Sequence, residues 1–220
     1  MEDAVPNWPE RLTREQARAA KEKEKCFTAA LKVKSKAAGW RFSGGSLFRQ
    51  RGDWFVSALP SLLWQRGVIV MSMAKPMGVD PIFWGIVGLS ENEALPLSFR
   101  ANGAWVLRPP MPNTYVALEE GDPEKLADAV IAWADSWLTD IDAKSLEALI
   151  SEIEGLGHLR SRFIALEICL HLMRRDYVRA LERIREMDEG ESGGFVTGDA
   201  SFLDQAEAWV SKQKPFGAVC

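Results

Sequence analysis

The spacing of hydrophobic and polar positions changes twice along this chain of 220 residues. The first segment, Arg14–Ala38, is rich in charged residues and alanine. It follows Thr13 as a candidate N-cap and precedes Gly39 as a candidate stop, which together predict one long helix. A short apolar patch around Phe27 and Leu31 lies only in its second half. We therefore expect the first half of this helix to project from the body or to lie on a partner.

Residues 46–108 instead carry short runs of aromatic and aliphatic side chains separated by turn residues, the pattern of an antiparallel sheet of about five strands. The expected strands are Ser46–Arg51, Trp54–Leu59, Gly67–Ala74, Leu97–Arg100 and Trp105–Arg108. Gly52 and Asp53 separate the first two runs and both tolerate a positive φ, which predicts a hairpin. The third run is apolar on both faces, as a covered central strand would be. Pro60 is expected to bend the chain or to mark an edge, and the prolines at 109, 110 and 112 to end the sheet.

Helical spacing dominates from residue 122 onward, where Asp122 and Pro123 suit an N-cap and a first helical position. The helix that follows carries an apolar stripe formed by Leu126, Val130, Trp133 and Trp137, and we expect both of its tryptophans to lie in the core. Core packing is also the expected role of the tryptophans in the sheet region, Trp40 among them. Residues 160–173 are apolar almost all round, so we expect a buried central helix there. The segregation of strands from helices indicates an α+β fold with an N-terminal helix, the sheet and a C-terminal helical bundle. The expected division is a flexible N-terminal tail at 1–12, an α+β domain at 13–140 and a helical C-terminal subdomain at 141–220.

The composition is rich in tryptophan, with nine residues, and poor in histidine, with two. Tryptophan fills cores and anchors interfaces, whereas histidine is the commonest catalytic acid–base group and metal ligand. This balance favours packing or binding over hydrolytic or metal chemistry. The three cysteines are far apart and form no Cys-x-x-Cys pair, which argues against a disulfide framework or a zinc finger and makes a reducing cytoplasm the expected compartment. We expect no membrane span, because no apolar run approaches the roughly 20 residues that a span needs. We expect no signal peptide, because the start lacks a basic region followed by an apolar stretch.

Charge is unevenly distributed along the chain, although its net value is only −4. Residues 1–112 hold 16 Lys/Arg and 10 Asp/Glu, while residues 113–220 hold 11 and 21. The modest basic excess lies mainly on the first helix, so nucleic-acid binding is not expected. Six acidic residues of the second half are the candidate partner-binding residues: Glu119, Glu120, Glu124, Asp128, Asp135 and Asp142. They form either an ordinary solvated face or an acidic ridge that speeds association with a basic partner. Trp8, between two prolines, is the best candidate for an exposed aromatic anchor.

Several short motifs resemble catalytic or binding motifs but lack the context that their chemistry needs. Ser72 and Lys75 have the Ser-x-x-Lys spacing of acyl-transfer enzymes, yet they lie on an expected strand, where positions i and i+3 point to opposite faces. Glu167 and His171 can meet on one helix face, but a metal site would need further ligands. A local hydrogen bond, or a histidine at a helix end beside Arg174, is the expected role. The glycine-rich stretches match no phosphate or dinucleotide loop, so no catalytic residue, metal site or cofactor is predicted.

Two segments resemble known families. Residues 26–139 combine a helix ending in Lys-x-x-Gly-Trp-Arg-Phe, Phe48 and Arg49 before a hairpin, a long apolar strand and a later helix with tryptophans. In this order the segment resembles a bacterial family of small α+β domains of unknown function, whose members often occur beside toxin genes. That resemblance implies an immunity or accessory role. The run from Asp176 to Leu181 resembles the second half of a tetratricopeptide hairpin, a family that binds proteins on a concave surface, although the chain has no second copy about 34 residues away.

Taken as a sequence, the chain is expected to be a non-catalytic, cytoplasmic bacterial protein-binding protein. Its most concrete form is an immunity protein that neutralises a cognate toxin by direct binding, with the acidic ridge for steering and aromatic anchors for affinity. A basic toxin domain is the candidate partner. Two alternatives stay open. One is an enzyme acting on an anionic small molecule at a site lined by Arg49, Arg51, Arg66 and sheet tryptophans; a deep polar pocket with convergent arginines and acids would favour it. The other is an adaptor whose helical C-terminal part binds peptides. The identity of the partner and the oligomeric state stay open.

Overall fold

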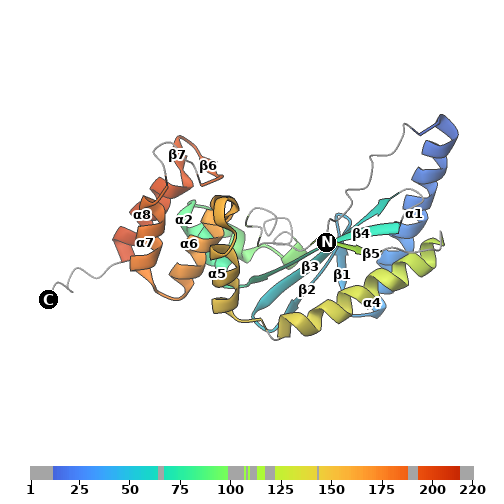
Figure 1. The fold of residues 1–220 in the computed structure, drawn as a ribbon, viewed down its shortest axis with the longest axis horizontal. Coiled ribbons are helices and arrows are strands. Elements are labelled where there is room, and N and C mark those ends of the chain that lie inside the picture. Colours follow the sequence, from blue (N-terminus) through green and yellow to red (C-terminus); the bar gives the residue numbers. More distant parts are fainter. Residues whose placement is uncertain are drawn as a thin grey trace.

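Strands and helices are segregated along the chain, which confirms the predicted α+β fold (Figure 1). The computed structural model describes residues 12–63, 67–98, 107, 109, 113–116, 122–142, 144–187 and 193–213. The helices are α1 (Arg14–Ala37), α2 (Val79–Ile86), η1 (Ser90–Ala94), α4 (Pro123–Asp142), α5 (Leu146–Glu154), η2 (Gly157–Phe163), α6 (Ile164–Met173), α7 (Tyr177–Arg185) and α8 (Phe202–Gln213), of which η1 and η2 are 3₁₀ helices. The strands are β1 (Arg41–Ser43), β2 (Ser46–Arg51), β3 (Trp54–Leu63), β4 (Gly67–Pro76), β5 (Asn113–Val116), β6 (Val196–Thr197) and β7 (Ala200–Ser201).

Helix α1 begins and ends where local signals place it. The Thr13 hydroxyl accepts a hydrogen bond from the Gln16 amide, and the Gln16 side chain accepts one from the Thr13 amide, which is a complete capping box. Gly39, with φ +77°, follows the last turn, and the Trp40 amide then reaches back to the Ser35 carbonyl at 2.9 Å. The buried residues of α1 begin at Phe27. Its first half extends beyond the sheet, as expected from its charged sequence (Figure 1).

Four consecutive antiparallel strands, β1–β4, form the body of the sheet, and the short β5 pairs with the other side of β4. The predicted hairpin between β2 and β3 is confirmed: Arg51 pairs with Trp54 around a two-residue turn in which Gly52 has φ +56°. The described pairs of β2 with β3 end at Ala58. Pro60 therefore lies where β3 pairs with β4 alone, which is the edge position expected of a proline without an N–H.

The predicted second hairpin is wrong where the structure describes it. Leu97 and Ser98 are helical, and residues 99–106 and 108 lie outside the described part of the chain. The sheet instead gains β1 from residues outside the expected strands, and β5 from residues directly after the prolines that we expected to end it. Both additions are short and rest on pairing with a longer strand, such as Ile69 with Tyr115. Four strands thus form the body of the sheet where about five were expected.

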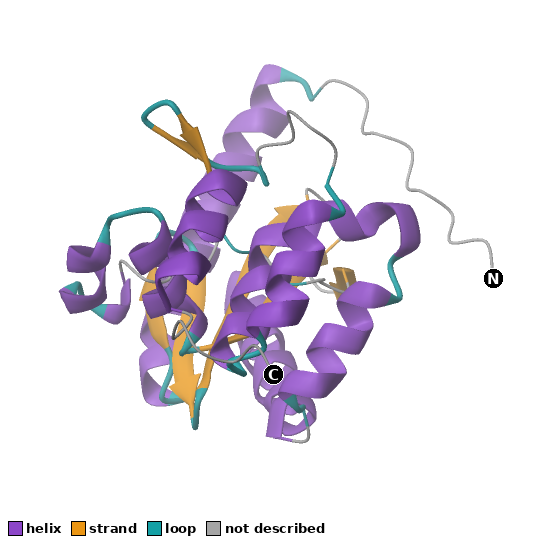
Figure 2. Ribbon diagram, turned by 90° about the vertical axis from the view of Figure 1, so that its left-hand side faces the viewer, coloured by secondary structure: helices purple, strands orange, loops and turns teal. Residues whose placement is uncertain are grey.

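Two large hydrophobic clusters occupy the two ends of an elongated molecule (Figure 1). The first lies between one face of the sheet and the helices α1 and α4, with Leu47, Val56 and Val68 from the strands. The second is formed by α5–α8 around α6, which is buried from Ile164 to Leu172. Helix α2 also belongs to this cluster, although it precedes those helices by a long stretch of sequence. Figure 2, turned by 90°, shows helices in front of the strands. The expected division at residue 140 stays a prediction.

Candidate functional site

Helix α4 carries three strips of side chains along its length. The buried strip packs against the sheet and α1 and consists of Leu126, Ala127, Val130, Ile131, Ala134, Leu138 and Ile141. At 3.6 residues per turn, one border of this strip is acidic and the opposite border is aromatic. The acidic border, here called the acidic seam, consists of Glu124, Asp128, Asp135 and Asp142. The aromatic border consists of Trp133 and Trp137.

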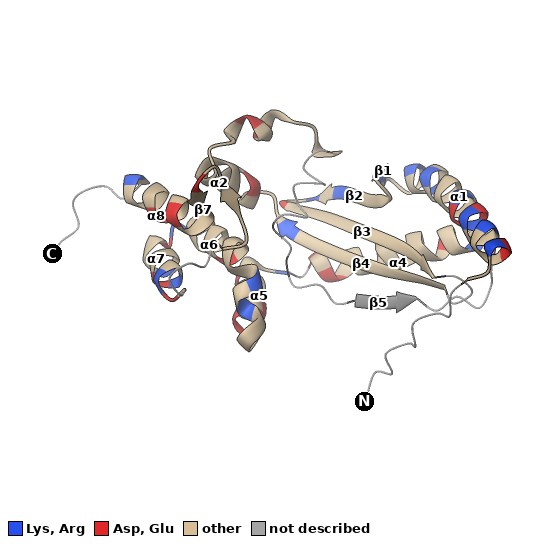
Figure 3. Ribbon diagram, turned by 90° about the horizontal axis from the view of Figure 1, so that it is seen from above, with Lys and Arg blue, Asp and Glu red and all other residues tan. Residues whose placement is uncertain are grey.

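The N-terminal end of the acidic seam joins α4 to α1, a helix that carries both signs of charge along its length (Figure 3). The Lys34 ammonium lies 2.6 Å from a carboxylate oxygen of Asp128 and 3.0 Å from one of Glu124. It also donates a hydrogen bond to the Glu124 carbonyl. The pKa of Lys34 is raised, first by its hydrogen bonds to these two side chains. One lysine thus fixes two carboxylates of the predicted ridge.

The middle of the acidic seam holds the loop that enters the sheet. The indole N–H of Trp40 donates a hydrogen bond of 2.9 Å to Asp135. Trp40 is buried, and the Arg49 guanidinium lies 4.9 Å from the centre of its ring, within cation–π range. Asp135 and Arg49 therefore hold Trp40 by its N–H and by one ring face. This tryptophan belongs to the core, as its place in the sheet region predicted.

The C-terminal end of the acidic seam binds β2. Arg51 donates two hydrogen bonds to Asp142, from Nε at 2.8 Å and from Nη2 at 2.7 Å. This two-point geometry is the strong form of the arginine–carboxylate pair. The hydrogen bonds from Arg51 lower the pKa of Asp142, and the reciprocal hydrogen bond raises the pKa of Arg51. All four carboxylates of the seam thus contact groups of their own chain, from elements that lie 90 or more residues away in sequence.

The aromatic border differs from its prediction. Trp133 and Trp137 stack with ring centroids 6.1 Å apart and planes inclined by 9°, and both are only half-buried. We expected both to lie in the core because they share a face with Leu126 and Val130. They lie instead at the edge of the buried face. The centre of that face is formed by residues such as Ala134 and Leu138, which were not part of the predicted four-residue stripe. Trp209 on α8 is likewise half-buried.

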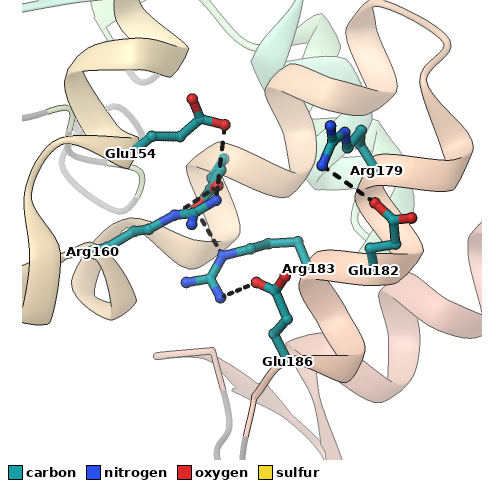
Figure 4. A network of polar contacts seen from close by, with 7 residues as sticks. Glu154, Arg160, Arg179, Glu182, Arg183 and Glu186 are labelled. Atoms are coloured by element: carbon teal, nitrogen blue, oxygen red, sulfur yellow. Dashed lines mark hydrogen bonds and ion pairs between the residues drawn. The ribbon is translucent and has the colours of Figure 1, made fainter.

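A second group of charges lies at the helical end of the molecule, centred on Glu167 of α6. Its carboxylate is fully buried and accepts hydrogen bonds from Arg160 of η2 and from Arg183 of α7, whose Nε lies at 2.9 Å. Arg183 also pairs with Glu186 at 3.1 Å, and Arg160 lies 3.9 Å from Glu154 of α5 (Figure 4). Two guanidinium groups thus compensate one buried carboxylate, and they tie four helical elements together.

His171 lies one turn after Glu167 on α6. The hydrogen bond expected between these two side chains is not among those of the described residues, whereas the position of His171 in the last turn of α6 agrees with the other alternative. Its Nδ1 is buried and has no hydrogen-bond partner among the described residues. Burial lowers the pKa of His171. One ligand atom each from Glu154, Glu167 and His171 lies within 4.8 Å of the others.

A third group is wholly internal and lies where the sheet meets α2. Lys75, at the end of β4, pairs with Asp80 in the first turn of α2, and both side chains are buried. Burial raises the pKa of the neighbouring Cys169 thiol. Ser72 is also buried, and it points to the sheet face opposite Lys75, because the two lie three positions apart on the same strand. The Ser-x-x-Lys spacing therefore brings no serine to this lysine.

Some of the remaining predicted site residues lie in the described part of the chain, and others lie outside it. Trp8, Glu119, Glu120 and Arg66 lie outside the described residues. Of the candidate pocket residues, Arg49 lies over the ring of Trp40, and Arg51 donates hydrogen bonds to Asp142. Lys34 was not predicted as a site residue, because nothing in the local sequence links it to the carboxylates of α4. None of the described helices combines the length and the apolar character needed to cross a membrane.

Comparison with models of protein families, with curated proteins and with solved structures finds no significant match to this chain.

Proposed function

We propose that this chain is a cytoplasmic protein-binding protein of the immunity type, which neutralises a toxin by binding it across the outer surface of α4. The observation that carries the proposal is the stacked and half-exposed pair Trp133–Trp137. Tryptophan is among the residues that contribute most to binding energy at protein interfaces. A pair already stacked on a helix loses little side-chain freedom on binding, which favours affinity.

The acidic seam indicates the sign of the charge expected on the partner. The side chains of Glu124 and Asp128 are each 64% exposed and that of Asp142 is 45% exposed, although all three have internal partners. Lys34 and Arg51 hold these carboxylates in place and leave part of each facing solvent. Fixed negative charges on the border of α4 opposite to the tryptophan pair favour a basic protein surface and speed its association. We infer that the bound face of the toxin is basic with an apolar pocket for the tryptophan pair.

The first experiment tests the immunity role itself. Each protein encoded beside the gene of this chain is expressed in a host cell, alone and together with the chain, and growth is followed. We expect one neighbour to stop growth when alone and to be neutralised when the chain is present, with a stable complex on co-purification. If no neighbour is toxic, or if a toxic one is not relieved, the immunity role is wrong.

The second experiment tests the surface. Trp133→Ala combined with Trp137→Ala should weaken the complex by roughly 2 kcal/mol or more, about 30-fold in Kd, as expected for an aromatic hot spot. Trp209→Ala is the matched control, because Trp209 is also half-buried but packs on the other cluster. Circular dichroism checks that each variant is folded. If the control and the double variant lose the same affinity, the tryptophan pair is not part of the interface.

The acidic seam needs a different design, since reversing Asp128 alone would also break its ion pair with Lys34. The exchange Lys34→Asp with Asp128→Lys keeps an ion pair between α1 and α4 but moves the negative charge across the seam. We expect the exchanged protein to stay folded and to associate more slowly with the toxin, with a weaker dependence on salt. Unchanged association kinetics would restrict the seam to a structural role.

A further inference from the structure

A His–Glu–Glu group at the junction of α5, η2 and α6 offers the ligand types that divalent transition metals accept. Glu154 comes from the last turn of α5, and Glu167 and His171 lie at positions i and i+4 of α6, on one helix face. One ligand atom from each lies within 4.8 Å of the others. Around a tetrahedral zinc ion with bonds of about 2.0–2.1 Å, ligand atoms lie about 3.4 Å apart. The group therefore needs a contraction of up to about 1.4 Å. Rotation of the half-exposed Glu154 side chain can supply much of it.

His171 supplies the second, independent observation. It is 6% exposed, and its Nδ1 has no hydrogen-bond partner among the described residues. Buried polar atoms nearly always have a partner, so an unpartnered one needs an explanation. The neighbouring Glu167 does not supply the partner, because its two oxygens accept hydrogen bonds from Arg160 and Arg183. A ligand that accepts a nitrogen lone pair would satisfy this atom.

Arg160 occupies the place between the two carboxylates. Its Nη2 binds Oε1 of Glu167 and lies 3.9 Å from Oε1 of Glu154. Arg183 donates a hydrogen bond of 2.9 Å to Oε2 of Glu167. Arg160 also lines an open depression of about 360 Å³ with His158 and Ser161, so its side chain has room to turn outward. That movement would free Oε1 of Glu167, while Arg183 would keep the carboxylate oriented.

We propose that Glu154, Glu167 and His171 form a site for a divalent transition-metal ion, and that the ion displaces the Arg160 guanidinium, which serves in this structure as an internal cation. Cobalt(II) and zinc(II) fit the mixed imidazole and carboxylate ligand set. The site lies on the helical end of the molecule, away from α4. Its test measures metal binding alone, so its outcome is independent of the proposed toxin partner.

The experiment is a titration of the purified full-length chain with Co²⁺, followed by its visible absorption bands and by competition with Zn²⁺. We expect binding at a 1:1 ratio. Glu154→Gln should weaken binding by roughly tenfold or more, and His171→Gln should remove the visible bands. Arg160→Met should bind about tenfold more tightly, because it removes the competing positive charge.

The controls separate this site from accidental ligands. Glu186→Gln changes a carboxylate of the same network that lies outside the ligand group, and it should leave Co²⁺ affinity unchanged. His158→Gln and Cys26→Ser remove exposed groups that bind metals nonspecifically, and they should also have no effect. Glu154 is exposed, so Glu154→Gln should fold even if the Arg160 variant does not. Unchanged Co²⁺ binding in Glu154→Gln and His171→Gln, or binding lost in His158→Gln or Cys26→Ser, would overturn the proposal.

Discussion

Lys75 and Asp80 place two opposite charges in the interior, where each is costly without the other. Lys75 is fully buried, and Asp80 is 3% exposed with its Oδ2 unpaired among the described residues. The attraction between two such charges offsets their desolvation, whereas one charge alone stays uncompensated. The pair therefore fixes how the end of β4 meets the start of α2.

We expect Asp80→Asn to lower the free energy of unfolding by about 3–5 kcal/mol, because it removes the carboxylate charge that pairs with the buried Lys75 ammonium. Urea denaturation measures this loss. The double variant Lys75→Met with Asp80→Asn removes both charges and should recover most of the stability. Equal losses in the single and the double variant would show that the charges do not compensate each other.

Asp142 gives a pH dependence whose sign follows from its lowered pKa. The unfolded carboxyl has a pKa near 3.9. A folded pKa below that value means that the Arg51 pair stabilises the protein above about pH 4, and that this contribution is lost as pH falls through the folded pKa. Asp142→Asn should therefore be less stable than the parent at pH 7, with a difference that closes in acid.

Thermal unfolding between about pH 2.5 and pH 7 measures that difference. Asp140→Asn, an exposed substitution on the same helix, is the matched control and should show no such pH dependence. A difference for Asp142→Asn that stays constant across this range would contradict the expectation.

At the scale of elements, the turn before α8 depends on a glycine for two separate reasons. Gly193 has φ +66°, and a Cβ there would lie 3.2–3.3 Å from side-chain atoms of Phe202 and Leu203. Gly198, in the same loop region, has φ +63° but nothing within 4 Å. Gly193→Ala and Gly198→Ala should each lower the free energy of unfolding by roughly 1–2 kcal/mol, because both place an alanine at a positive φ. Gly193→Ala should lose about 1–3 kcal/mol more, because its methyl group overpacks the start of α8. Equal loss in chemical denaturation would show that the side chains move aside freely.

The helices could be predicted because their signals are local. Thr13, Gly39 and Asp122 each contact backbone within a few residues, so their roles follow from neighbouring sequence. Strand β5 could not be predicted, since a four-residue strand gains its stability from β4 and not from its own pattern. The register of β2 with β3 could be predicted although it joins two strands, because the two-residue turn at Gly52 fixes it.

The same distinction applies to the candidate site. The acidic residues of α4 could be found as a row, but their partners could not, because Lys34 and Asp128 lie 94 positions apart. Trp133 and Trp137 are half-exposed because they lie at an angle around the helix axis from the centre of the buried strip. That centre is known only once all the buried residues of α4 are known. The triad around His171 needed Glu154 from another helix, and the i, i+4 pair alone did not indicate it.

At the scale of the whole molecule, Trp54 is the described residue that packs against both hydrophobic clusters. It begins β3 and lies where the sheet end meets the helical end. We expect Trp54→Ala to cost about 3 kcal/mol, the low end for a large aromatic residue, because Trp54 is partly exposed. Loss of this shared contact should also separate the unfolding of the two ends.

Hydrogen exchange of the sheet and of α6 at rising denaturant concentration measures whether the two ends open together. Trp209→Ala is the control, since Trp209 packs only against the helical cluster and should not separate the transitions. A single cooperative opening in the Trp54→Ala protein would show that other contacts couple the two ends.

The place of α2 in the second cluster has a consequence for how the protein is made. Val79 and Phe83 of α2 are buried against helices that come much later in the chain, and α8 ends at Gln213. Roughly 125 residues separate the end of α2 from that point, which a ribosome adds in about 6–25 s at ~5–20 residues per second. During that interval the sheet can form with α1, but the apolar face of α2 stays without its partners. The nascent chain thus carries a hydrophobic helix open to chaperones, or to another copy of the same chain, until α8 has been synthesised.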